Sequence, residues 1–192
     1  YGCIIYDNGW VGTDRGNGHA IYTQNENGTK GIANCIFTGG QGYRIHAYGS
    51  KQASVNNYLI EKNICYNAGR LHVGGYKPSE NIRVFQNTLY NVSMQLGFRA
   101  PYNEDCELRN NLIINGELTI DKYKKTVDQG NLVLKKGDPR TRGTHVVLHP
   151  NKYDAGRAHL ALYNGDALSG VLVNFSKFLK RGDKFRLMSA KD

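Results

Sequence analysis

The pattern of apolar and polar positions repeats along the first two thirds of the chain. Asparagines recur at Asn63, Asn87 and Asn111, 24 residues apart, and each precedes three mostly apolar residues. Two positions upstream of each asparagine also recur every 24 residues. The first is occupied by Tyr58, Ile82 and Cys106, and the second by Ile60, Val84 and Leu108. Short strand-like runs at a period of about 20 to 30 residues, without a helical pattern, are typical of a parallel β-helix. We therefore expect each period to form one coil of a solenoid.

Related segments extend this pattern in both directions. Residues 3–7, 34–38 and 131–134 carry the same segment, with spacings of 31 and 29 residues early in the chain and 20 late. The longer spacings predict loops that leave the coils, and we place them at residues 8–18 and 24–30. The last coil is expected to end near Leu134.

The asparagines and cysteines are both interpreted as structural. Asparagine tolerates unusual dihedral angles at a tight corner, and its amide can donate and accept along a stack, so an amide ladder is expected. Cys35 and Cys65 are predicted to lie one column apart, with Cys3 and Cys35 offset in the same way. Side chains of neighbouring strand residues point to opposite faces, so we expect four free, buried thiols rather than disulfides.

A second set of runs is the candidate for chemistry. In residues 20–24, 44–48, 70–74, 93–97 and 117–121 the second and fourth positions are largely apolar and should face inward. The predicted inner stack is Ile21, Ile45, Leu71, Met94 and Leu118. The predicted outer row is Tyr22, His46, His72, Gln95 and Thr119, with Arg44 and Arg70 beside it and Gln24 and Tyr48 beginning a third row. Stacked Arg-x-His pairs would repel one another, and an acidic or hydroxyl-rich ligand would relieve that repulsion.

The early insertions are expected to wall one end of this face. They carry Trp10, Asp14, Arg15 and Glu26. An aromatic wall, a polar floor and cationic groups suit a sugar chain, whose hydroxyls need hydrogen bonds and whose rings pack on aromatic side chains. The alternative is an ordinary polar sheet face with neutral histidines.

Two segments carry a resemblance to a known superfamily. Residues 18–25 (GHAIYTQN) and 45–50 (IHAYGS), with the Asn-apolar-apolar coils, resemble right-handed parallel β-helix repeat proteins of the pectate-lyase-like superfamily. The resemblance covers residues 1 to about 134, and it implies a right-handed coil of three parallel sheets and an extracellular role on polysaccharides. That superfamily includes lyases, hydrolases, epimerases, tailspikes and adhesins, so it implies no single activity.

Candidate roles follow from the residue types. For lyase chemistry on a uronate, Arg44 or Arg70 would neutralise the carboxylate, His46 or His72 would abstract the α-proton, and Tyr48 or Tyr22 would protonate the leaving oxygen. Only Glu117 and Asp121 lie on the outer rows, which disfavours a two-carboxylate hydrolase. A loose calcium site at Asp14 and Glu26 and zinc at the three histidines 19, 46 and 72 are the metal hypotheses, and no cofactor is certain.

The remaining third of the chain differs in pattern and charge. Residues 1–120 contain 10 Lys and Arg against 9 Asp and Glu, whereas residues 121–192 contain 15 against 7. Residues 135–144 are expected to form a basic linker, and residues 145–192 a small antiparallel β-sandwich-like unit, short for a complete sandwich, with strands at 145–148, 158–163, 171–175 and 184–187. The basic part suits an anionic cell surface.

The expected class is therefore an all-β, secreted, carbohydrate-active protein. The alternative is a noncatalytic adhesive, structural or filament-forming β-helix, which would self-associate through exposed coil ends. Nucleic-acid motifs and a membrane-spanning run are absent from the sequence. Because the chain opens within a repeat, we expect a mature product or a fragment of a longer protein.

Overall fold

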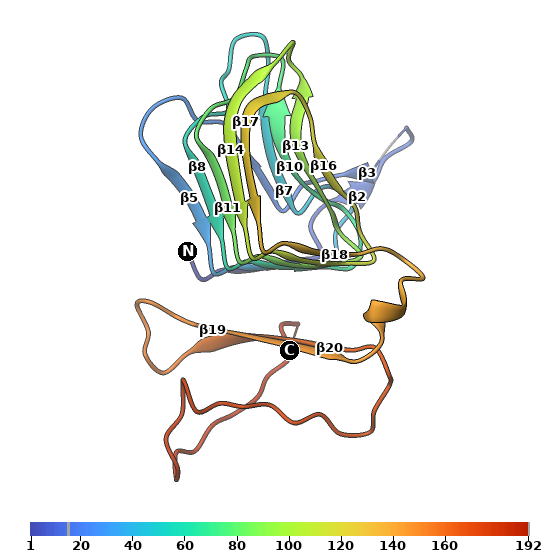
Figure 1. The fold of residues 1–192 in the computed structure, drawn as a ribbon, viewed down its shortest axis with the longest axis vertical. Helices are drawn as coiled ribbons and strands as arrows, with labels where there is room; N and C mark the ends of the chain where they lie inside the picture. The colour runs from blue at the N-terminus through green and yellow to red at the C-terminus, as the bar shows by residue number, and fades with distance from the viewer. Residues whose placement is uncertain (15, 192) are drawn as a thin grey trace.

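The structure, a computed structural model that describes residues 1–14 and 16–191, is a parallel β-solenoid followed by a β-hairpin (Figure 1). Sheet 1 consists of β1 (Ile4–Tyr6), β6 (Ile36–Thr38), β9 (Ile64–Tyr66), β12 (Thr88–Tyr90), β15 (Leu112–Ile114) and β18 (Leu132–Leu134). Sheet 2 consists of β4 (Ile21–Thr23), β7 (Ile45–Gly49), β10 (Arg70–Gly75), β13 (Ser93–Arg99) and β16 (Leu118–Ile120). Sheet 3 consists of β5 (Lys30–Ala33), β8 (Tyr58–Glu61), β11 (Ile82–Phe85), β14 (Asn103–Arg109) and β17 (Tyr123–Gln129). The predicted solenoid is confirmed.

The core consists of side chains stacked between successive coils. In sheet 2 the strands pair in parallel at the predicted positions, so that Ile21, Ile45, Leu71, Met94 and Leu118 form one inner stack. Its middle members, Ile45 and Leu71, are fully buried. A single coil could not bury these residues, because each coil covers the apolar face of the next.

The amide ladder is also confirmed. Asn63 Nδ2 donates to Asn87 Oδ1 at 3.0 Å, Asn87 Nδ2 donates to Asn111 Oδ1 at 2.9 Å, and Asn111 Nδ2 donates to Asn131 Oδ1 at 2.8 Å. Each Oδ1 also accepts the backbone N–H of the residue one coil earlier, including that of Cys35 at the start. The ladder therefore satisfies buried backbone groups that would otherwise lack partners.

The conformational reason given for the ladder asparagines was wrong. The left-handed residues are those just before them, at Asn34, Lys62, Gln86, Asn110 and Gly130. The coil turns from sheet 3 into sheet 1 at these positions, and the ladder residue that follows has no positive φ. Asn is therefore selected at the ladder positions for its amide rather than for its dihedral angles.

The cysteines are free, as expected, but three details differ from the prediction. Cys65 pairs with Phe37 and therefore lies two columns from Cys35 rather than one. Cys3 is exposed, whereas Cys35, Cys65 and Cys106 are buried. Cys3 and Cys35 also share a column, because Ile4 pairs with Ile36 and the Cys3 N–H donates to Cys35 Sγ at 3.4 Å. The sulfur thus takes the place of the ladder amide oxygen, and the stretched spacing of the early coils had concealed this register.

The hairpin lies across the outer face of sheet 1 (Figure 1). After a short 3₁₀ turn at Pro139–Thr141, β19 (Thr144–Pro150) pairs antiparallel with β20 (Ala158–Asn164). The Tyr90 and Tyr163 rings lie 5.2 Å apart, and the Lys152 N–H donates to Tyr1 Oη at 2.6 Å. The hairpin therefore runs along the solenoid axis, from the last coil to the first.

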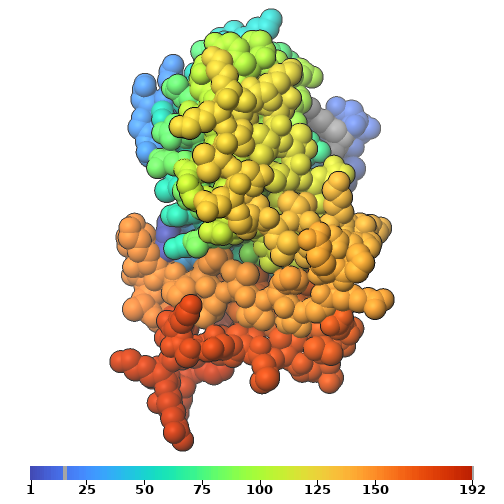
Figure 2. All heavy atoms as spheres, in the orientation of Figure 1, coloured from blue at the N-terminus to red at the C-terminus, as the bar shows by residue number. Residues whose placement is uncertain are grey.

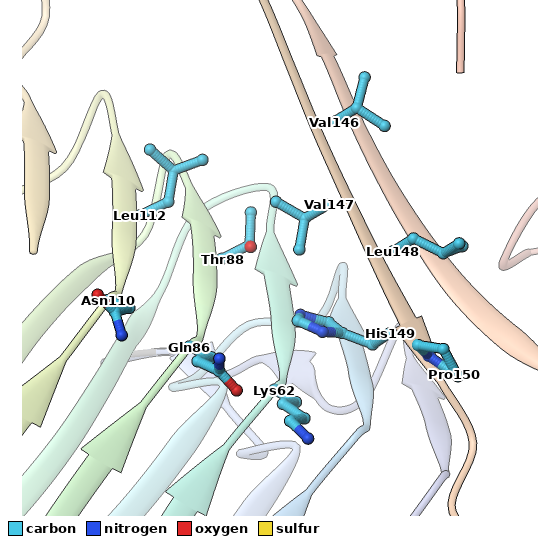
Figure 3. A pocket seen from close by; sticks show the side chains of 10 residues that line it. All are labelled: Lys62, Gln86, Thr88, Asn110, Leu112, Val146, Val147, Leu148, His149 and Pro150. Carbon is cyan, nitrogen blue, oxygen red and sulfur yellow. The ribbon is translucent and has the colours of Figure 1, made fainter. Parts of the chain in front are cut away.

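Val147 and His149 of β19 point toward the corner residues of the solenoid, whereas Val146 and Leu148 point away from them (Figure 3). β19 and the corner residues line a cavity of about 430 Å³ between them, formed by Lys62, Gln86, Thr88, Asn110, Leu112 and residues 146–150. His149 is buried there, and burial, followed by the charge of Lys62 and by His159, lowers its pKa to about 4. The imidazole is therefore neutral at the docking surface near pH 7.

The segment after the hairpin contradicts the sequence prediction. Residues 171–175 and 184–187 form no strands in the described part of the chain, although the Phe175 and Phe185 rings contact each other at 5.2 Å. Leu172 is fully exposed, so no partner strand satisfies this run. The segment forms an irregular outer layer over the hairpin (Figure 2). Together with β20 and sheet 1, it lines an open cavity of about 1550 Å³. Within residues 1–14 and 16–191, no helix is long and apolar enough to cross a membrane.

Candidate functional site

The predicted outer row lies on the outer face of sheet 2. Strand pairing places Tyr22 beside His46, His46 beside His72, His72 beside Gln95 and Gln95 beside Thr119. Exposure differs along the row: Tyr22 is 54% exposed, whereas His72 is 2% exposed. The row is thus accessible at its Tyr22 end and covered at its centre.

An aromatic cluster surrounds His46. Its ring centroid lies 4.5 Å from Tyr43, 5.1 Å from Tyr48, 5.2 Å from Tyr22 and 5.2 Å from His72. The sequence did not assign Tyr43 to the site, and it named His19 only in the zinc hypothesis, because both residues precede a strand and lie outside the alternating pattern. Alternation gives no signal for Tyr43, because a residue two positions before the inward-facing Ile45 would itself be expected to face inward.

Two separate sets of hydrogen bonds hold the three histidines of this face. The Tyr43 N–H donates to His19 Nδ1 at 2.9 Å, and His19 Nε2 lies 3.0 Å from His46 Nδ1. On the next coils, His72 Nδ1 lies 3.3 Å from Gln95 Oε1, which also accepts from Arg70 Nη1 at 2.6 Å. The imidazoles are therefore held by specific partners rather than free to rotate.

Both central histidines are neutral near pH 7. Burial, with smaller contributions from His19 and His72, lowers the pKa of His46 to about 3. Burial also lowers the pKa of His72 to about 4, opposed by its hydrogen bond to Gln95 and assisted by Arg70. The main cause of both lowered pKa values is desolvation rather than the charge of a neighbouring arginine.

Arg44 does not lie beside Arg70 on the outer surface, and this part of the prediction was wrong. Its side chain is 2% exposed, with Nε donating to the Ala68 carbonyl at 2.8 Å and Nη2 to the Gly40 carbonyl at 3.2 Å. A Cβ on Gly69 would lie 2.9 Å from Arg44 Nε, so glycine at that corner leaves room for the guanidinium. β7 begins only at Ile45, so strand alternation does not govern Arg44.

Arg70 remains at the partly exposed edge of the row. Its guanidinium lies 5.8 Å from the centre of the Tyr43 ring, in addition to its bond to Gln95. Arg70 thus connects the aromatic cluster to the polar end of the row.

A β-bulge adds two side chains that the sequence pattern missed. Val73 pairs with Leu96 and Gly75 pairs with Arg99, so β13 contains one extra residue between these pairs. Gly97, at φ 84°, takes up the bulge, and a Cβ there would lie 2.2 Å from the Asp121 carbonyl oxygen. Bulges re-aim side chains, and this one brings the Phe98 ring to 5.2 Å from His72.

The same bulge supplies a second cation. The Arg99 guanidinium lies 5.2 Å from the Tyr76 ring and hydrogen-bonds the Tyr76 hydroxyl. Burial, followed by Tyr76, raises the pKa of Tyr48, so this phenol is neutral near pH 7.

The remaining predicted residues occupy the margin of the face. Gln24 Nε2 donates to the Tyr48 carbonyl at 3.1 Å, so the Gln24 amide is hydrogen-bonded to the next coil. Trp10 lies in the short hairpin of β2 (Trp10–Val11) and β3 (Gly16–Asn17) and is 67% exposed. Asp14 is exposed in the same hairpin, and Arg15 lies outside the described residues.

Metal binding finds no support in this geometry. Among residues 1–14 and 16–191, no group of three or more His, Cys, Asp or Glu side chains is arranged to hold a metal ion. This applies to the zinc hypothesis at the three histidines and to the calcium hypothesis at Asp14 and Glu26.

Comparisons with protein-family models, with curated proteins and with solved structures find no match to this chain. The class that the structure defines is therefore a parallel β-solenoid bearing an aromatic, histidine-rich face.

Proposed function

We propose that the outer face of sheet 2 binds an extracellular polysaccharide with acidic sugar residues. The observation that carries this proposal is the aromatic cluster around His46, flanked by Arg70 and Arg99. Tyrosine rings offer flat apolar surfaces and hydroxyl groups, which match the faces and edges of sugar rings. Secretion and membership of the pectate-lyase-like superfamily belong to the same proposal.

Charge favours an acidic sugar over a neutral one. The two arginines are accompanied on this face by the neutral His46 and His72 imidazoles and by tyrosine hydroxyl groups, and Glu117 and Asp121 are confined to the far end of the stack. A uronate carboxylate would accept hydrogen bonds from these donors without repulsion from a protein carboxylate.

The test is a binding titration of the chain with oligogalacturonate, alginate oligomers and a neutral glucan. The Tyr43→Ala and Arg70→Met variants should each weaken binding of the acidic oligomers by about 10-fold, the loss of one such interaction. Thr119→Ala, on the same row but away from the cluster, is the matched control. Equal binding by all four proteins would refute the proposed site.

Cleavage by elimination is a second candidate, supported by the neutral His46 imidazole beside the neutral Tyr48 phenol. Elimination from a uronate polymer leaves an unsaturated product that absorbs in the near ultraviolet. The product should form with the native chain and disappear in His46→Ala. Binding without that product supports a noncatalytic adhesin, and absence of binding favours a structural or self-associating solenoid.

A further inference from the structure

The hydrogen bonds at His19 fix the tautomer of His46. A backbone N–H only donates, so the bond from Tyr43 requires an unprotonated Nδ1 on His19. The proton of neutral His19 is then on Nε2, which faces His46 Nδ1 at 3.0 Å. His46 Nδ1 accepts that hydrogen bond, and the proton of neutral His46 is therefore on Nε2.

His72 has the opposite tautomer. Arginine only donates, so the bond from Arg70 identifies the Gln95 atom as the carbonyl oxygen. That oxygen only accepts, so His72 Nδ1, at 3.3 Å, carries the proton. His72 Nε2 then has a lone pair, and it is buried without a partner among the described residues.

The two tautomers differ in what they offer a ligand. His46 is half-buried, and the atom directed away from its His19 bond is an N–H donor. The lone pair of His72 lies within a side chain that is only 2% exposed, beside Phe98. The accessible imidazole therefore donates, and the imidazole with a free lone pair is covered.

We propose that Tyr43, His19 and His46 form a directional hydrogen-bond relay that presents His46 Nε2–H to an acceptor oxygen of a uronate carboxylate. His19 is a positioning residue in this relay, because it acts through His46. This inference rests on the proposed carbohydrate-binding function and narrows it to recognition of a carboxylate by a fixed donor. Because Nδ1 accepts from His19 and Nε2 already holds a proton, His46 has no lone pair for a substrate proton. The relay therefore assigns His46 to recognition and stands against the elimination reaction given above as the second candidate.

The relay can be tested with the full chain carrying ¹⁵N-labelled histidine. Long-range ¹H–¹⁵N correlation spectra at pH 7 should show the proton of His46 on Nε2 and that of His72 on Nδ1. His19→Gln retains an amide that can accept from Tyr43 and donate to His46, whereas His19→Leu retains neither function. We expect His19→Leu to weaken binding of an oligogalacturonate probe by about 10-fold, as for loss of one oriented charged hydrogen bond, and His19→Gln to restore most of it.

The outcomes separate the relay from the proposed function. A His46 proton on Nδ1, or on both nitrogens, at pH 7 overturns the relay even when the probe binds. Unchanged binding in His19→Leu overturns it as well. If the spectra show the expected tautomers but no acidic oligomer binds, the proposed function is overturned, and the carboxylate is then excluded as the ligand of His46. A sulfated glycan that binds more tightly than the galacturonate probe overturns the carboxylate assignment alone.

Discussion

Replacing Asn87 by alanine should destabilise the solenoid more than any other single change in the amide ladder. Asn87 is fully buried, and its side chain accepts from the Asn63 N–H and Nδ2 and donates to Asn111 Oδ1 and to the Ile60 carbonyl. The Asn63 N–H and the Ile60 carbonyl would lose these partners in a dry corner. Each orphaned buried group costs about 1–3 kcal/mol, so we expect a loss of about 4 kcal/mol in the free energy of unfolding.

The matched control is Asn131→Ala, the same substitution at the open end of the ladder. Asn131 is partly exposed, so water can replace its amide, and the expected loss is about 1 kcal/mol. Urea denaturation followed by circular dichroism measures both values. An equal decrease in the free energy of unfolding for the two variants would refute the idea that the ladder stabilises the fold through its burial. A decrease below about 1 kcal/mol for Asn87→Ala would refute it as well.

Three further predictions follow from buried groups. Stability should fall as the pH drops from 6.5 to 4, because the pKa values of His72 and His149 are both lowered to about 4 in the folded state and each shift corresponds to about 3 kcal/mol. Urea midpoints that do not change between pH 7 and pH 4.5 would contradict this, and His149→Phe should make the profile less steep while the His72 contribution remains. A thiol reagent should modify Cys3 alone in the native protein and all four cysteines in denaturant, because the other three are buried with raised pKa values; rapid modification of a second native thiol would contradict the assignment. Arg44→Met should lower the free energy of unfolding by about 2 kcal/mol, because two carbonyls lose their donor, whereas Arg70→Met should weaken carbohydrate binding with little change in stability. If Arg44→Met weakened carbohydrate binding and Arg70→Met lowered the free energy of unfolding, Arg44 would belong to the binding site.

The solenoid could be predicted because its core is periodic. Columns such as Ile45 and Leu71 stay in register across coils, and strand alternation then determines which side chains face outward. Strand alternation did not predict side-chain orientation at residues outside the strands. Arg44 is one residue before β7, and its orientation depends on space left by glycines at a corner, which alternation does not describe.

The bulge was missed although the sequence contained a signal for it. His72 and Gln95 are 23 residues apart, whereas Asn63 and Asn87 are 24 apart within the same coil. The later coil thus has one residue fewer between the ladder asparagine and the outer row. Because the next ladder asparagine, Asn111, is again 24 residues on, the coil must contain one extra residue after the row, and that residue lies in the bulge at Gly97. The pairing of His19 with His46 had no comparable signal, because it depends on where a loop returns to the sheet.

The hairpin across sheet 1 has a consequence for how the molecule unfolds. Five strand spacings of about 4.8 Å give sheet 1 a width of about 24 Å, and a seven-residue strand spans about 20 Å, so β19 covers most of that width. The turn after β19 covers the remainder, and its Lys152 reaches the first coil. In an ordinary solenoid each repeat contacts only its neighbours, and the ends fray independently. Here residues that follow the last coil are hydrogen-bonded to Tyr1 and Gly2 in the first, through the Lys152 N–H and the Arg157 guanidinium. The hairpin therefore acts as a strap that couples the two ends, and loss of one terminal coil removes support from the other.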